Sequence, residues 1–176
     1  MYSLFLNPGL LMHFIDDFKS NNFNERPKSI THIVLHYTDL ASAEESLKVL
    51  CDPNSKVSAH FLIDDNGDIY GLIDCLKRAW HAGVSNWEGI DNVNDFSIGI
   101  ELQNKGHSTY PLEPYPKIQM ESLIKLLQFL TTKYGINPLN VIGHSDIAPL
   151  RKKDPGEHFD WNFLKAYGFG IDRTLY

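Results

Sequence analysis

The sequence predicts a single domain of the mixed α/β class. The chain has 176 residues, a length typical of one compact domain with a sizeable core. Two segments, 30–38 and 95–104, are rich in the β-branched and aromatic residues that favour strands. Segments with the apolar spacing of amphipathic helices lie between and after them. Because strands and helices are interleaved along the chain, we expect a mixed α/β fold.

The predicted domain occupies residues 30–170. It lies between an N-terminal extension (1–29) and a short C-terminal tail (171–176). Within the extension, the polar segment SNNFNERPK (20–28) is expected to be a loop that leads into the domain. No internal repeat or linker divides the sequence further.

Local signals support each element of the domain. The predicted elements are, in order, a strand at 30–38, a helix at 42–51, a hairpin within 56–74, a strand at 95–104, a helix at 116–135, a strand at 140–144 and a helix at 160–168. Ser42, with Glu45 three residues later, forms a capping-box pattern at the start of the first helix. Asn66-Gly67 is a strong turn signal for the hairpin. Gly135 supplies a stop for the longest helix.

Side-chain patterns indicate which faces are buried. In the strand 95–104 one face carries Phe96, Ile98, Ile100 and Leu102, and the other carries Ser97, Gly99, Glu101 and Gln103. One face of the longest helix carries Met120, Leu123, Leu127 and Leu130. The segment 30–38 is apolar enough to be a central strand. The last helix is expected to start at Asp160 and to stop near Gly168.

Composition narrows the class of partner and compartment. Sixteen basic and twenty-two acidic residues give a net charge of −6, which argues against a nucleic-acid partner. Cys51 and Cys75 lack metal-ligand spacing and fit a reducing compartment, although one disulfide stays open. The apolar start has no early positive charge and is too short to span a bilayer. We therefore expect the cytoplasm, with the cell envelope as the alternative. The oligomeric state is left open.

The stretch GHSDIAPLRKKDPG (143–156) is the strongest candidate site. Its charges, prolines and glycines predict neither a regular helix nor a core segment. His144 ends a predicted strand, and Asp154 lies ten residues later. With His36, at the end of another strand, these residues would offer zinc three ligands and leave a fourth position for water. The alternative is that the strand-end histidines are ordinary structural residues.

Five motifs point to a known family. VLHYT, AHFLID, RAWHAGVS, NDFSIGIELQN and GHSDIAPLRKKDPG closely resemble the zinc-dependent N-acetylmuramoyl-L-alanine amidases. Their superfamily also contains the peptidoglycan recognition proteins and the phage lysozyme-type amidases. The motifs span about residues 30 to 162 in the family's order. The resemblance implies a central mixed sheet flanked by helices, with zinc at the floor of a groove.

The resemblance also implies roles for individual residues. His36, His144 and Asp154 would bind one zinc ion per chain. Glu101 would act as the acid/base residue and Lys152 would stabilise the oxyanion. The alternative for Glu101 is a solvated strand glutamate or a salt-bridge partner. The alternative for Lys152 is a surface lysine, which is what we expect of its neighbour Lys153.

The implied reaction is hydrolysis of the amide between N-acetylmuramic acid, or its 1,6-anhydro form, and L-alanine in a muropeptide or peptidoglycan fragment. Phage-type relatives carry a catalytic tyrosine where this chain has Ala59. In this respect the chain resembles the bacterial subgroup in which a glutamate takes that role, and the resemblance therefore implies the acid/base role for Glu101.

Three further residues are expected to contact the substrate. Trp80 and His81 could stack on or bond to the sugar and the first peptide residues, or could instead be a core tryptophan and a turn histidine. Arg151 could bind a carboxylate of the stem peptide, or lie free at the rim. The alternative function is a module that binds peptidoglycan without cutting it. A structural scaffold would leave the metal and acid/base residues unexplained.

Overall fold

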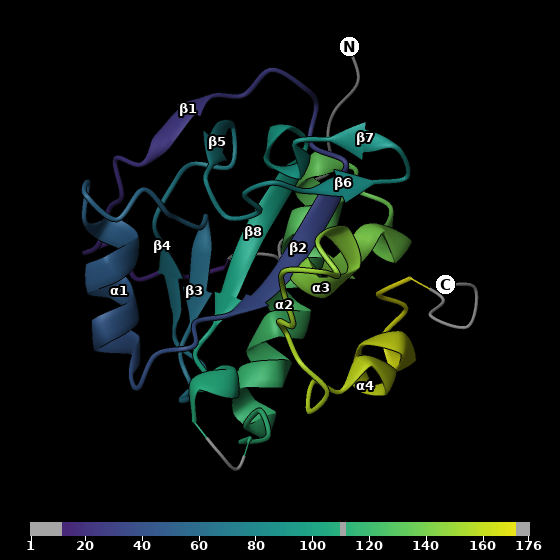
Figure 1. Ribbon diagram of the computed structural model, residues 1–176. Helices are drawn as coiled ribbons and strands as arrows, with labels where there is room; N and C mark the ends of the chain where they lie inside the picture. Colours follow the sequence, from purple (N-terminus) through teal and green to yellow (C-terminus); the bar gives the residue numbers. More distant parts are fainter. Residues whose placement is uncertain (1–11, 110–111, 172–176) are drawn as a thin grey trace.

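The computed structural model describes residues 12–109 and 112–171. Within them, five strands form a central sheet in the order β4-β3-β8-β2-β9 (Figure 1). The strands are β2 (His32–Tyr37), β3 (Phe61–Ile63), β4 (Ile69–Gly71), β8 (Ser97–Leu102) and β9 (Val141–Gly143). Strands β3, β8, β2 and β9 are parallel, and β4 is antiparallel to β3. The prediction of a mixed central sheet is confirmed, and β2 lies in its interior.

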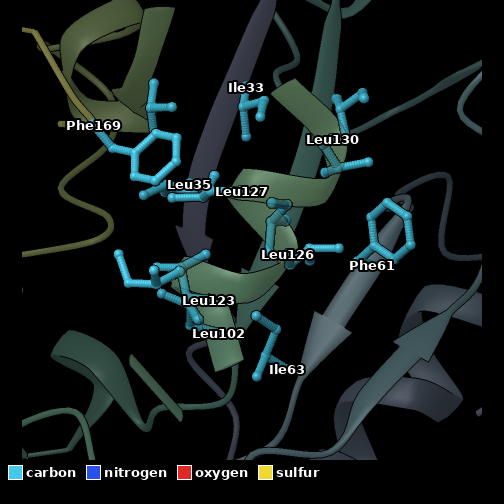
Figure 2. Packing of buried hydrophobic residues seen from close by; sticks show 14 of the residues in the cluster. Ile33, Leu35, Phe61, Ile63, Leu102, Leu123, Leu126, Leu127, Leu130 and Phe169 are labelled. Carbon is cyan, nitrogen blue, oxygen red and sulfur yellow. The ribbon is translucent and has the colours of Figure 1, made fainter. Parts of the chain in front are cut away.

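The longest helix, α2 (Lys117–Tyr134), covers one face of the sheet. Its buried leucines pack against alternate residues of β2, β3 and β8, and Figure 2 shows them next to Ile33, Leu35, Phe61 and Ile63. The helix ends at Gly135, which has the left-handed conformation (φ 67°) that favours glycine. Most of the apolar core therefore lies between α2 and the sheet.

The opposite face of the sheet carries two separate apolar clusters. One cluster packs α1 (Ala43–Cys51) against Leu62 of β3. The other packs α3 (His144–Ile147) and the loop before β8 against Val34 and Ile142. His36 and Glu101 belong to this same face, where the strands β2 and β8 pair residue by residue. The polar side chains are thus held between two apolar supports.

Two small sheets lie outside the central one. β1 (Phe23–Glu25) pairs with β5 (Lys77–Ala79), and β6 (Asn86–Trp87) pairs with β7 (Ile90–Asp91). The prediction of a loop at 20–28 is therefore wrong for the three residues of β1. Phe23 packs against the α1 cluster, which explains why this polar segment is ordered as a strand. Short 3₁₀ helices occupy Val93–Asp95, Gly106–Ser108 and Pro138–Asn140.

Most local signals act as predicted. The hairpin β3–β4 turns at residues 64–68, where Gly67 has a φ of 89°. Ser42 Oγ accepts the amide of Glu45 and begins α1. Asp160 Oδ1 accepts the amide of Phe163 and begins α4 (Trp161–Ala166).

Two expectations are wrong. Phe96 packs with the cluster on the site face, because it precedes the strand and has a non-extended backbone. The stretch 143–156 contains the short helix α3, and His144, Ile147 and Asp154 within it are buried.

Parts of the predicted extension and tail, residues 1–11 and 172–176, lie outside the described residues. No helix in the described part of the chain is long and apolar enough to cross a bilayer.

Candidate metal centre

Three ligand atoms converge where β2 and β9 end. His36 is the next-to-last residue of β2 and follows the pair Leu35–Gly143, so His144, the residue after Gly143, is its neighbour. The Nδ1 atoms of the two histidines are 2.9 Å apart. Asp154 Oδ2 lies 3.0 Å from Nδ1 of His36 and 2.9 Å from Nδ1 of His144. These residues form a group able to hold a metal ion, and the structure brings together the three ligands that the sequence predicts.

Both imidazoles are oriented by contacts at Nε2, the ring nitrogen that does not face Asp154. Nε2 of His144 lies 3.1 Å from the carbonyl oxygen of Ala82, which can only accept, so this nitrogen carries the proton. Nε2 of His36 lies 3.1 Å from Nδ1 of His81. With the outer nitrogens engaged, both Nδ1 atoms face Asp154 Oδ2. Two imidazole nitrogens and one carboxylate oxygen are a donor set that suits zinc.

The charges of the centre favour a bound cation. Burial, reinforced by the neighbouring His144, lowers the pKa of His36 to about 4. Burial alone would raise the pKa of Asp154, but the close approach of His144 and His36 outweighs it and holds the pKa below its usual range. At neutral pH the centre therefore has a neutral His36 beside an ionised Asp154. All three residues are less than 5% exposed.

Backbone contacts bring the loop that carries Asp154 onto the strand ends. The amide of Ser145 donates to the carbonyl of Asp154 at 2.9 Å. Asp146 Oδ2 accepts the amide of Gly143 at 2.6 Å. A Cβ atom at Gly143 would lie 2.8 Å from Cδ of Pro155, so only glycine allows this approach. Sequence and packing thus fix the distance between His144 and Asp154.

Glu101 lies directly beside His36, its partner in the β2–β8 register. Its Oε2 atom is fully covered and has no hydrogen-bond partner among the residues described. Burial raises the pKa of Glu101 well above its ordinary value, as does the charge of Asp154, while Lys152 opposes the shift. Glu101 is therefore a half-buried residue with one covered carboxyl oxygen, and its carboxyl group tends to hold a proton beside the candidate metal centre.

All of the predicted site residues line one cleft, with a volume of about 410 Å³. Lys152 and Lys153 both line the cleft, but Lys152 is half-buried whereas Lys153 is exposed. Trp80 is half-buried and donates from Nε1 to Asn24 Oδ1 at 2.6 Å. Arg151 is exposed, and its Nη2 donates to the carbonyls of Ala82 and Val84, each at 2.8 Å.

The structure adds contacts and supports that the sequence does not indicate. His81, predicted to contact substrate, is 8% exposed and lies between His36 and Ser97. Asn94 Oδ1 accepts the amides of His81 and Ala82. Ser97 and Gly99 share the strand face of Glu101, and that alternation is the one signal in the sequence that could have found them.

Two other histidines take different positions. His60 is fully buried, and its Nδ1 accepts the amide of Gly99 at 3.0 Å. His107 lines the cleft and lies within hydrogen-bond distance of Tyr37 Oη and Glu157.

Comparison with known proteins agrees with this arrangement. The sequence matches the family described as N-acetylmuramoyl-L-alanine amidase over residues 26–157. N-acetylmuramoyl-L-alanine amidase AmiD of Escherichia coli is 40% identical over 149 residues, which cover 78% of this chain and 53% of that protein. 1,6-Anhydro-N-acetylmuramyl-L-alanine amidase AmpD of Haemophilus influenzae is 36% identical over 163 residues, covering 81% and 86%. The chain thus spans about half the length of the AmiD relative.

A solved structure gives the same fold. AmiD from Escherichia coli, in complex with anhydro-N-acetylmuramic acid-L-Ala-D-gamma-Glu-L-Lys, superposes with a TM-score of 0.74 at 36% identity. The superposition covers 86% of this chain and 63% of that one. Because the family match covers most of the sequence and relatives share its fold, this protein belongs to the N-acetylmuramoyl-L-alanine amidase family.

Proposed function

We propose that this protein hydrolyses the amide bond between the lactyl group of N-acetylmuramic acid, or its 1,6-anhydro form, and L-alanine. The observation that carries the proposal is the convergence of three possible metal-ligand atoms beside a carboxyl group that has one covered, unpartnered oxygen. The names of the relatives support the reaction. The AmiD structure, which holds an anhydromuramyl peptide as its substrate, supports a substrate of that class here.

The metal in this proposal is zinc, held by His36, His144 and Asp154. Three nitrogen and oxygen ligands with a fourth position free are typical of catalytic zinc sites. Zinc in such a site lowers the pKa of water to about 7 and polarises the substrate carbonyl.

Glu101 supplies the proton transfers. As water attacks the carbonyl carbon, the Glu101 carboxylate takes a proton from that water. The carboxyl group then returns the proton to the alanine nitrogen as the C–N bond breaks, so the peptide leaves as a free amine. Burial and the Asp154 charge, which raise the pKa of Glu101, also favour the protonated form needed for this second step.

Lys152 supplies a positive charge in the same cleft. Negative charge develops on the carbonyl oxygen during attack, and a cation in a partly buried wall stabilises it. The half-buried position of Lys152 supports this role, whereas the exposed position of Lys153 does not.

Trp80 and Arg151 are proposed to hold the substrate. The Trp80 indole is anchored through Nε1, which leaves its ring to stack on the sugar or peptide. Arg151 is fixed through Nη2 by two backbone carbonyls, so its charge is held at the rim of the cleft. A fixed guanidinium suits a carboxylate of the stem peptide.

A digest read by mass spectrometry tests the proposal. The purified protein is incubated with an anhydromuramyl tripeptide and, separately, with the muramyl form. Release of the free L-alanyl peptide, stopped by a chelator and recovered with zinc, is the expected result. Binding of an intact muropeptide by the zinc-loaded protein would contradict hydrolysis and favour a recognition module.

We further propose the cytoplasm as the compartment, with the cell envelope as the alternative. Cys51 and Cys75 are both free thiols, a state that persists where the environment is reducing. Cell fractionation with an antibody to the protein tests this assignment, and recovery with the envelope would contradict it.

A further inference from the structure

We infer that His81 is a positioning residue: a relay from Ser97 through His81 sets the tautomer and orientation of the His36 imidazole. This inference rests on the proposed metal-binding role of His36. It concerns only the tautomer and orientation of the His36 ring.

The relay is fixed by one hydroxyl hydrogen. Ser97 Oγ donates to the carbonyl oxygen of Val93 at 2.7 Å, so its only hydrogen is committed. The Oγ atom also lies 3.3 Å from Nε2 of His81, and can only accept there. Nε2 of His81 therefore carries the proton and Nδ1 of His81 is the acceptor.

The same reasoning identifies which ring nitrogen of His36 carries the proton. Nδ1 of His81 lies 3.1 Å from Nε2 of His36. Because His81 accepts at this atom, Nε2 of His36 is the donor and Nδ1 of His36 keeps its lone pair. That Nδ1 is the atom that faces His144 and Asp154. The relay thus presents the correct nitrogen to a metal ion.

The backbone is shaped to hold His81 in this place. A Cβ atom at Gly99 would lie 2.3 Å from Cγ of His81, closer than any side chain tolerates. Glycine at this point of β8 therefore opens the space that the His81 ring fills. Asn94 Oδ1 accepts the amides of His81 and Ala82, at 3.1 and 2.8 Å, and anchors the segment from the other side.

The segment also serves the second histidine ligand. The carbonyl of Ala82 accepts from Nε2 of His144 at 3.1 Å. Two successive residues, His81 and Ala82, therefore orient both imidazoles. His81, at 8% exposure and with both ring nitrogens engaged, has no free nitrogen to offer a substrate.

Zinc affinity of the purified protein, measured by competition with a coloured chelator, tests the relay without any use of activity. Leucine and asparagine have nearly the same shape, but only asparagine keeps a polar atom at the position of Nδ1. His81→Leu should bind zinc about 10–100-fold more weakly than the parent. His81→Asn should recover most of that loss.

Two serine variants separate the relay from simple burial. Ser97→Ala should weaken zinc binding by about tenfold, at the lower end of the range for such partners. Ser20→Ala is the matched control: Ser20 is also buried, donates to Leu50 O at 2.6 Å and accepts from the Asn22 amide at 3.3 Å. It has no link to His36, so its zinc affinity should equal that of the parent.

Gly99→Ala tests the space behind the ring. Displacement of His81 should weaken zinc binding, and the effect should vanish in a His81→Ala background, where no ring is present to collide. Histidine ring nitrogen shifts, read by NMR on the zinc-loaded parent, report the tautomer directly. A proton on Nδ1 of His36 would overturn the inference.

The outcomes distinguish this inference from the proposed function. A parent that binds zinc, with His81→Leu and Ser97→Ala variants that bind as tightly, would overturn the relay alone. A parent that binds no zinc would remove the proposed metal centre, and the relay with it.

Discussion

The substitution Glu101→Gln separates proton transfer from metal binding. Glutamine keeps the shape of the side chain but cannot take or return a proton. Loss of a general acid/base group lowers kcat by about 10²–10⁴-fold, which corresponds to about 2.7–5.4 kcal/mol of activation free energy. Oε2 of Glu101 has no hydrogen-bond partner among the described side chains, so an amide nitrogen at that atom breaks no hydrogen bond. Zinc content should therefore stay at the parental value.

The same substitution tests how the stability of the folded protein depends on pH. The pKa of Glu101 is raised above its ordinary value of 4.5 in the folded protein, so the folded state binds more protons than the unfolded chain. The ionised form then destabilises the fold as the pH rises through and above that ordinary value. In metal-free protein Glu101→Gln should be as stable as the parent near pH 4 and more stable at pH 7–8.

The assays are kcat on an anhydromuramyl peptide, zinc content by elemental analysis, and urea unfolding at several pH values. Glu25→Gln is the control, because Glu25 is an exposed strand glutamate paired with Lys77. It should leave kcat and zinc unchanged. Parental turnover by the Glu101→Gln variant would refute the acid/base role. Loss of zinc together with turnover would mean that Glu101 acts on the metal centre instead.

Three further predictions follow from the site and the core. Asp154→Ala removes the oxygen that faces both histidines and should abolish stoichiometric zinc binding; elemental analysis that finds full zinc would contradict its role as a ligand. Lys152→Ala should lower kcat by about 10²–10³-fold while Lys153→Ala leaves it near the parent, and equal effects in steady-state kinetics would refute the distinction. Leu127→Ala, at a fully buried position beneath the sheet, should cost about 2–5 kcal/mol of unfolding free energy with zinc ligation intact; a change under about 1 kcal/mol in urea unfolding would show that the core tolerates the cavity.

The long, regular elements could be predicted because their patterns are strong. The apolar residues that alternate in 95–104 and those on one face of 116–135 pack against each other in one core, so both patterns reflect burial. The strand β1 could not be predicted, since Phe23–Glu25 has only one apolar residue and is ordered by pairing with β5. Alternation alone places Phe96 on the wrong face, because the strand begins one residue later.

The three residues of the candidate metal centre could be predicted from the sequence, but the residues that support them could not. Two strand-end histidines and a loop aspartate carry a pattern, and the family motifs identify them. Whether His81 reaches the substrate or the back of His36 depends on how its loop folds over β8. That choice is set by the missing side chain at Gly99, which the sequence alone does not connect to His81.

A zinc titration of metal-free protein tests the central claim most directly. The protein is stripped with a chelator, zinc is added back in known amounts, and release of L-alanyl peptide from an anhydromuramyl peptide is followed. We predict no cleavage without metal and a linear rise that ends at about one zinc ion per chain. Cleavage by the stripped protein at the parental rate, or full zinc binding without cleavage, would contradict the account.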